Sequence, residues 1–258
     1  MKRALCALAV AAAIGAAAGC SSPTISTATD SLTTIQVVAA ESVWAEVATQ
    51  IGGTNVHVTT LTNGSGDKKA VAGAQVLIVN GAGLDPWASE DAATNPGVGR
   101  LDVNVGDEVG VTPGGDPYLW YDPAYVNAAA ERIEADFAQL RPGSATYFQQ
   151  QEQAFERSSQ ATDEALASTI KSRFAGTHVT TCAGLASDVA AHLGLKPQQK
   201  LTQSKALLCD TQGDRSLLAA AASAKIPVVS LTETLAPAGT TFQQWLTAQL
   251  QQIQQALT

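Results

Sequence analysis

The sequence predicts an α/β protein of two lobes, each built on a parallel-rich sheet, joined by one long helix. Two observations support this prediction. At both ends of the chain, short runs rich in β-branched residues alternate with longer amphipathic stretches, which is typical of parallel sheets covered by helices on both faces. In the middle of the chain, helical periodicity continues without any strand signal. A single doubly wound domain would not need such a connection.

Six short runs have the composition of strands. In chain order they are Ile35–Ala39, Val56–Leu61, Gln75–Val79, His178–Cys182, Ala206–Cys209 and Ile226–Leu231. The amphipathic stretches Glu41–Ile51, Ala183–Leu193 and Ser216–Ala224 follow three of these strands and are expected to be helices. The clearest helix is Thr241–Leu257, whose apolar residues keep to one face while glutamines occupy the other.

The middle of the chain separates the two lobes. Asp122–Leu140 and Ser144–Arg173 have helical patterns, and Arg141-Pro142-Gly143 interrupts them. We therefore predict an N-terminal α/β lobe over residues 34–140, a connecting helix over 144–173 and a C-terminal α/β lobe over 175–258.

The N-terminus has the form of a secretory signal. A cationic start is followed by the apolar run Ala4–Ala18, which is short for a membrane span and ends in Ala17-Ala18-Gly19-Cys20. Small residues directly before a cysteine resemble a bacterial lipoprotein cleavage box. We expect residues 1–20 to be the signal peptide with its lipobox, Cys20 to carry the lipid, and residues 21–33 to be a flexible tether. The protein is then anchored on the extracytoplasmic face of the cell membrane.

Composition excludes several classes of function. The net charge of −8 and the pI near 4.8 leave no electrostatic basis for binding nucleic acid. No Gly-x-Ser-x-Gly elbow and no Gly-x4-Gly-Lys loop occurs, so the sequence gives no sign of an enzyme. After the leader, no apolar run is long enough to cross a bilayer.

Five collinear stretches resemble a known family. They are ESVWAEVATQIGG, AQVLIVNGAGLDPW, DPYLWYDP, AAHLGLKP and IPVVSLTETLAPAGTTFQQWLTAQL, beginning at Glu41, Ala74, Asp116, Ala190 and Ile226. Together they resemble the solute-binding lipoproteins of zinc and manganese ABC transporters, the ZnuA- and TroA-like proteins. The resemblance implies two lobes joined by a rigid helix, a ligand cleft between them, a zinc or manganese cargo, an ABC permease as partner, and a monomer.

The resemblance also implies a damaged metal site. The family holds its ion with three histidine-type ligands and a carboxylate. The loop before Gln75 has no histidine here, although it offers Asp67; Tyr118 stands in the second histidine position, and Cys182 in the third. The carboxylate is kept as Glu233. A neutral phenol is a poor zinc ligand at pH 7, so the site is degenerate, and Tyr118 is expected to hydrogen-bond Glu233 across the cleft.

Other polar residues near this site have plainer explanations. Asp116 and Asp122 are expected to be caps or supporting partners, with Asp122 capping a helix that starts at Pro123. Asp210 follows the strand that ends at Cys209 and is expected to face the same cleft. The three histidines, by the resemblance, lie away from the cleft loops; they are His57, His178 and His192.

Cys182 and Cys209 remain after the leader is removed. They end successive strands, so neighbouring parallel strands would bring them within reach of a disulfide. The alternative is a soft-metal site made by both cysteines with Glu233. Two functions therefore stay open: a metal-transport receptor with a degenerate site, or an accessory, partner-binding lipoprotein on the same scaffold that no longer binds metal.

Overall fold

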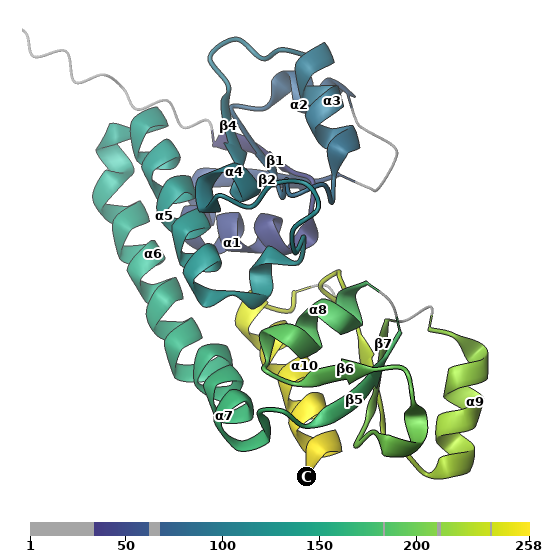
Figure 1. The fold of residues 1–258 in the computed structure, drawn as a ribbon. Coiled ribbons are helices and arrows are strands. Elements are labelled where there is room, and N and C mark those ends of the chain that lie inside the picture. Colours follow the sequence, from purple (N-terminus) through teal and green to yellow (C-terminus); the bar gives the residue numbers. More distant parts are fainter. Residues whose placement is uncertain (1–33, 62–67, 183, 211–212, 238) are drawn as a thin grey trace, which may run out of the picture. The chain divides into compact units, whose positions relative to one another are not determined.

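Two four-stranded parallel sheets organise the protein in its computed structural model (Figure 1). The structure describes residues 34–61, 68–182, 184–210, 213–237 and 239–258. The expected lipidation site Cys20, the tether and Asp67 lie outside these residues. Leu32–Thr258 forms one compact unit, and the following description concerns this unit.

The first sheet has the strand order β2-β1-β3-β4. Its strands are β1 (Ile35–Ala39), β2 (Val56–Thr60), β3 (Val76–Val79) and β4 (Leu101–Asn104). β1 lies between β2 and β3, with Ile35 opposite Val56 and Val37 opposite Val76. All three pairings are parallel, so every strand ends at the same edge of the sheet.

The second sheet repeats this plan with the order β6-β5-β7-β8. Its strands are β5 (His178–Thr181), β6 (Lys196–Gln198), β7 (Leu207–Asp210) and β8 (Val228–Leu231). Three helices belong to it: α8 (Leu185–His192), α9 (Arg215–Ala224) and α10 (Phe242–Leu257). The parallel pairing of β5 with β7 places the two cysteine-bearing strand ends side by side, as the sequence predicts.

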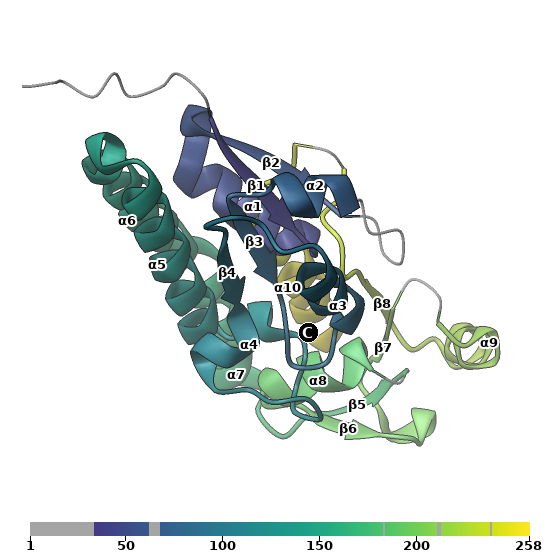
Figure 2. The ribbon, with the colours of Figure 1, turned by 90° about the horizontal axis from the view of Figure 1, so that it is seen from above.

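Long helices connect the two sheets. α5 (Pro123–Leu140) and α6 (Ala145–Ser159) lie side by side in both ribbon views (Figures 1 and 2). A π-helical turn over Gln160–Glu164 joins α6 to α7 (Ala165–Phe174), so the predicted connecting helix is present with one irregular turn in it. Between α5 and α6 the chain turns at Pro142–Ser144, because proline cannot continue a helix interior.

Shorter helices complete the first sheet's lobe. They are α1 (Ser42–Gly52), α2 (Lys68–Gly73), α3 (Pro86–Thr94) and α4 (Val105–Val109). α1 turns a continuous buried face toward the sheet, including Val43, Trp44, Val47 and Ile51. This is the 3–4 residue spacing that the sequence shows for Glu41–Ile51.

Aromatic rings link the lobes through the core. Trp44 of α1 packs edge-on against Trp120, with ring centroids 6.4 Å apart. Trp120 contacts Tyr121, and Tyr121 contacts Trp245 of α10, each pair again at 6.4 Å. All four rings are buried. The aromatic part of GGDPYLWYDP is therefore mostly core rather than the wall of a ligand site, and one ring of it, Tyr118, is left partly exposed.

Two strands escape the sequence prediction, and each has a local reason. β4 is the short run Leu-Asp-Val-Asn at the edge of the first sheet; a loop that contains proline and glycine precedes it, and α4 follows it directly. β6 is Lys-Pro-Gln, which holds a proline and no large apolar residue. Proline is tolerated on an edge strand because one side of that strand needs no ladder bond. Pairing with a neighbour, rather than propensity, makes these segments strands.

The remaining predicted elements agree within one or two residues. α5 begins at Pro123 with the Asp122 carboxylate accepting a hydrogen bond from Ala124 N at 2.9 Å, the cap the sequence predicts. α10 begins with a reciprocal cap between Thr241 and Gln244. Within the described ranges, no helix is both long and apolar enough to cross a membrane.

Candidate functional site

Tyr118 is hydrogen-bonded to Glu233. The Tyr118 hydroxyl donates a hydrogen bond to Glu233 Oε1 at 3.0 Å. Tyr118 comes from the segment that follows the first sheet, and Glu233 follows β8 of the second sheet, so this bond joins the two lobes. The sequence predicts this contact between two positions that hold metal ligands in the resembling family.

The phenol oxygen of Tyr118 has a second partner. It also takes a hydrogen bond from the backbone at Leu185, the first residue of α8, and a Cβ placed on Gly184 would lie 3.4 Å from it. Burial and the negative charge of Glu233 raise the pKa of Tyr118 to about 12. The hydroxyl is therefore neutral at physiological pH and keeps its proton for Glu233.

The backbone around Tyr118 is held by its neighbours. Asp116 Oδ1 accepts a hydrogen bond from Tyr118 N at 2.9 Å, which makes Asp116 the cap of a tight turn. Asn80 Nδ2 donates to the carbonyl of Pro117 at 2.9 Å. These two bonds hold the N–H and the carbonyl of the Pro117–Tyr118 peptide, so the backbone that carries the Tyr118 ring is fixed by the first lobe.

Asn80 belongs to a buried polar network that the sequence did not reveal. Trp44 Nε1 donates to Asn80 Oδ1 at 3.0 Å. The Asp85 carboxylate accepts from Asn80 N at 2.6 Å and from Gly81 N at 2.8 Å. Asp85 is 1% exposed, and its burial raises its pKa while the two N–H bonds lower it. The network ties α1, the end of β3 and the Tyr118 segment together.

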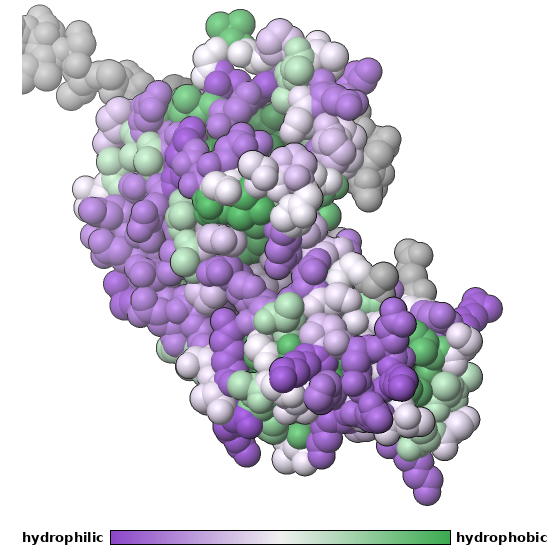
Figure 3. Space-filling view, viewed as in Figure 1, coloured by the Kyte–Doolittle hydropathy of each residue, from purple (hydrophilic) through white to green (hydrophobic). Residues whose placement is uncertain are grey.

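A cavity of about 380 Å³ opens beside this network and reaches Glu233. Glu41 and Ser42 at the start of α1, Leu61 after β2, and Trp87 of α3 contribute to its wall. In the space-filling view, the surface is indented between the half that carries β1–β4 and the half that carries β5–β8 (Figure 3). Burial, Asp85 and Glu233 raise the pKa of Glu41 to about 7. We call this space the Glu41 cavity.

A second cavity, of about 420 Å³, corrects one expectation about the histidines. Tyr118, Asp116, Asp122 and His192 all line it. His192 Nε2 of α8 lies 3.8 Å from Asp122 Oδ2, so His192 does not lie away from the Tyr118 segment. Burial and nearby Lys171 lower its pKa, while Asp122 and Asp116 oppose that shift. His57 and His178 are exposed on β2 and β5.

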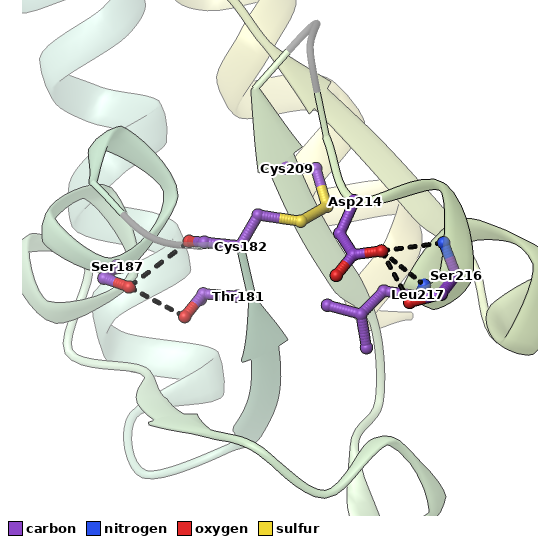
Figure 4. Close-up of a disulfide and its surroundings, with 7 residues drawn as sticks. All are labelled: Thr181, Cys182, Ser187, Cys209, Asp214, Ser216 and Leu217. Atoms are coloured by element: carbon purple, nitrogen blue, oxygen red, sulfur yellow. Dashed lines mark hydrogen bonds between the residues drawn. A yellow bond between two sulfur atoms is a disulfide. The ribbon is translucent and has the colours of Figure 1, made fainter.

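Cys182 and Cys209 form a disulfide between the ends of β5 and β7 (Figure 4). Their Cα atoms are 4.8 Å apart. Ser187 Oγ donates to the Cys182 carbonyl at 3.4 Å, and Asp214 caps α9 through Ser216 N at 2.7 Å. The prediction of a disulfide is thus confirmed. Its alternative, a soft-metal site with Cys182 as a ligand, is wrong for this form, because a disulfide sulfur offers no thiolate.

Two candidate residues from the sequence analysis remain, Asp210 and Asp67. Asp210 ends β7 next to the disulfide and is half-buried, but neither of the two cavities is lined by it. Asp67 is outside the described residues. Among the residues that the structure describes, no three His, Cys, Asp or Glu side chains converge in a way that holds a metal ion. A phenol bonded to one carboxylate does not fit the imidazole-rich set that zinc prefers.

Sequence reasoning missed Glu41, Asn80 and Asp85. One signal was available for Asp85, since the Asp85-Pro86 pair marks a helix start. Its carboxylate does not cap that helix, however, but accepts from the preceding Asn80 N and Gly81 N. Glu41 lies two residues beyond the carboxyl end of β1, and clefts open at this end of parallel strands. Nothing local distinguishes Asn80, because its partners Trp44 and Pro117 are 36 and 37 residues away in the chain.

Comparison with known proteins assigns a family model to most of the chain. The model described as ZnuA, zinc-uptake complex component A periplasmic, matches residues 37–206. No curated protein sequence gives a significant match.

Several solved structures share the fold. A periplasmic metal binding protein from Candidatus Liberibacter asiaticus is 18% identical, with 86% of this chain and 99% of that chain covered and a TM-score of 0.72. Zn(II)-bound AdcA from Streptococcus pneumoniae is 16% identical, with 87% and 58% covered and a TM-score of 0.71. The periplasmic zinc binding protein TroA from Treponema pallidum is 18% identical, with 88% and 100% covered and a TM-score of 0.67. At such low identities the likeness establishes the two-lobed fold.

Proposed function

Since the chain belongs to the ZnuA family of zinc-uptake complex component A proteins, we propose that it is the solute-binding protein of a zinc- or manganese-type ABC transport system with a degenerate metal site. The family consists of solute-binding proteins and not of enzymes. This protein would hold its cargo in the cleft between the lobes and pass that cargo to the permease. A lipid on Cys20 would keep the protein on the extracytoplasmic face of the membrane.

The hydrogen bond between Tyr118 and Glu233 carries the degenerate-site part of the proposal. By resemblance, Tyr118 stands in a histidine position and Glu233 in the carboxylate position. Their 3.0 Å hydrogen bond uses one of the two Glu233 carboxylate oxygens. The backbone N–H of Leu185 also donates to the phenol oxygen of Tyr118. An ion entering here would have to break this bond and would gain no imidazole. Metal binding is therefore expected to be weak.

The alternative, an accessory lipoprotein without metal cargo, rests on the same bond. If the Tyr118–Glu233 contact is permanent, it does what a bound ion would do, since it links the second lobe's Glu233 to the first lobe without any cargo. The disulfide at Cys182 removes a further ligand position in this form. The scaffold would then serve a partner rather than a solute.

Calorimetric titration distinguishes these two functions. The full-length protein, kept in mild detergent and stripped with a chelator, is titrated with zinc and then with manganese. We expect one ion per chain at an affinity weaker than about 1 μM, lost in Glu233→Ala. Tyr118→His should tighten zinc binding at least tenfold, about 1.4 kcal/mol, because it supplies an imidazole.

The control is Tyr147→His, which places an imidazole on α6, outside both cavities. Binding in Tyr118→His but none in the natural protein would support the accessory function. No saturable binding in either protein, with both demonstrably folded, would reject the metal site altogether.

A further inference from the structure

We propose that the Glu41 cavity binds a small organic cation, an alkylammonium compound, whose ammonium group contacts Glu41 and Glu233. The hydrocarbon part of such a ligand would pack on the apolar wall of the cavity. This inference rests on the proposed function in one respect only: in both, a solute enters the cleft between the lobes.

The charge of the cavity selects a cation. Glu41 and Glu233 are its only charged lining residues within the described part of the chain, and both are acidic. Asp85 adds a third negative charge close enough to act on Glu41. A concave site lined by one sign of charge concentrates ions of the opposite sign. An anionic solute would be repelled by these groups, and a neutral solute would gain no charge attraction from them.

Glu41 is the group in the cavity that lacks a partner. It occupies the N-cap position of α1, yet its side chain makes no capping bond. No other hydrogen bond or ion pair to its carboxyl group occurs among the described residues. Its half-buried carboxyl has lost much of its water without gaining a donor, and the resulting pKa near 7 agrees with this position. An ammonium ion would supply the missing donor.

Glu233 has room for the same ligand. Its Oε1 accepts from Tyr118, while Oε2 has no donor in the described residues. Tyr118 does not line the Glu41 cavity. A cation could therefore reach Glu233 from the cavity side without displacing the phenol, so this site shares Glu233 with the family's ligand positions but not Tyr118.

The size and the wall of the cavity favour an organic ligand over a bare ion. Its volume of about 380 Å³ lies in the range of small-molecule pockets. Leu61, Leu84 and Trp87 form its apolar side, and an indole ring attracts ammonium groups through its face. The hydroxyls of Thr60 and Thr234 add hydrogen-bond acceptors.

A metal ion has stricter needs than an ammonium group. It requires several donors that converge at about 2.0 to 2.6 Å, and no three His, Cys, Asp or Glu side chains in the described residues do so. An ammonium group needs only carboxylate oxygens at about 2.7 to 2.9 Å. The separated carboxylates Glu41 and Glu233 meet this second requirement through a ligand that lies between them.

The test is calorimetric titration of the full-length protein in detergent at pH 8, where Glu41 is ionised. The probes are 1-butylamine, 1,4-diaminobutane and the neutral 1-butanol. We expect one amine bound per chain, at least tenfold weaker binding in Glu41→Gln and in Glu233→Gln, and no binding of 1-butanol. Glu46→Gln is the matched control, since Glu46 lies on α1 outside the cavity, and its amine affinity should equal that of the natural protein.

Three outcomes would overturn the proposal: no amine binds, 1-butanol binds as well as the amine, or Glu41→Gln binds amine unchanged. Zinc binding that is lost in Glu233→Ala but kept in Glu41→Gln, without amine binding, would reject this inference and leave the metal-receptor function standing. Amine binding without zinc binding, in both the natural protein and Tyr118→His, would support this inference and reject the metal-receptor function.

Discussion

The two sheets end in different chemistry at their carboxyl edges, although they share one plan of four parallel strands. At the first edge, Asp85 accepts two backbone N–H bonds and Asn80 joins Trp44 to Pro117, all through buried polar groups. At the second edge, a covalent bond between Cys182 and Cys209 joins the strand ends. The first edge depends on many weak bonds that must all be satisfied, and the second on one strong bond.

This difference shows how each lobe presents its half of the cleft. The buried network fixes the backbone that carries Tyr118 and leaves Glu41 facing a cavity. The disulfide fixes β5 and β7, while Glu233 on the loop after β8 stays exposed. The first edge is therefore sensitive to charge and pH, and the second to redox conditions. Four changes would break or sharpen this comparison.

Loss of the disulfide should have the largest effect. Cys182 and Cys209 are 27 residues apart, and closing a loop of that length stabilises a protein by about 3 to 4 kcal/mol through the entropy of the unfolded chain. We expect Cys182→Ser with Cys209→Ser to lower the denaturant midpoint accordingly. Reducing the natural protein should produce the same shift and should not affect the double variant. An unchanged midpoint would show that the bond does not hold the second edge.

Asp85→Ala should come next. It leaves Asn80 N and Gly81 N buried without an acceptor, at a cost of about 1 to 3 kcal/mol for each group, less whatever water reaches them. We expect the free energy of unfolding, measured in urea, to fall by roughly 3 kcal/mol. Asp85→Asn retains one acceptor oxygen and should lose about half as much. Equal losses in the two variants would show that charge, and not the hydrogen bonds, matters at the first edge.

Glu41→Gln should stabilise the ligand-free protein at neutral and alkaline pH, but not at acid pH. Glu41 has a pKa of about 7 in the folded protein against 4.5 in the unfolded chain. Its ionisation therefore has no effect below about pH 4.5, its penalty grows as the pH rises from about 4.5 to about 7, and the penalty is constant above that. We expect the free energy of unfolding of Glu41→Gln to exceed that of the natural protein by about 1 to 3 kcal/mol at pH 8, and to equal it at pH 4.

The matched control for this measurement is Glu90→Gln, which removes an exposed carboxylate from α3. Its thermal midpoint should be nearly the same as that of the natural protein at both pH values. A gain for Glu41→Gln at pH 4 equal to that at pH 8 would contradict the assignment of the charge effect to this residue.

Tyr118→Phe should have the smallest effect on stability. The hydroxyl is partly exposed and its bond to Glu233 is worth less than about 1 kcal/mol. Because burial and Glu233 raise the pKa of Tyr118 to about 12, its contribution is present below pH 10 and is lost as the pH rises from 10 to 12. An ultraviolet titration should lose one phenolate transition near pH 12 in the variant. Loss of a transition near pH 10 instead would place Tyr118 in solvent.

Several features of this protein could be predicted because they depend on neighbours in the chain. The alternation of residues in Ile35–Ala39 and the face of Thr241–Leu257 fix a strand and a helix locally. Asp122 before Pro123 identifies a helix start for the same reason. The two cysteines could be paired because only parallel neighbouring strands had to be assumed.

The tertiary structure decided the rest. Lys196–Gln198 is a strand only because β5 pairs with it, and His192 lies near Asp122 only because α8 packs beside the Tyr118 segment. The sequence by itself determined the α/β class and the two lobes, since these follow from the periodicity of apolar residues along the chain. It could not determine the Glu41 cavity, because burial, the pKa of a carboxyl group and the absence of a donor depend on atoms brought together from the start of α1, β2, α3 and the loop after β8.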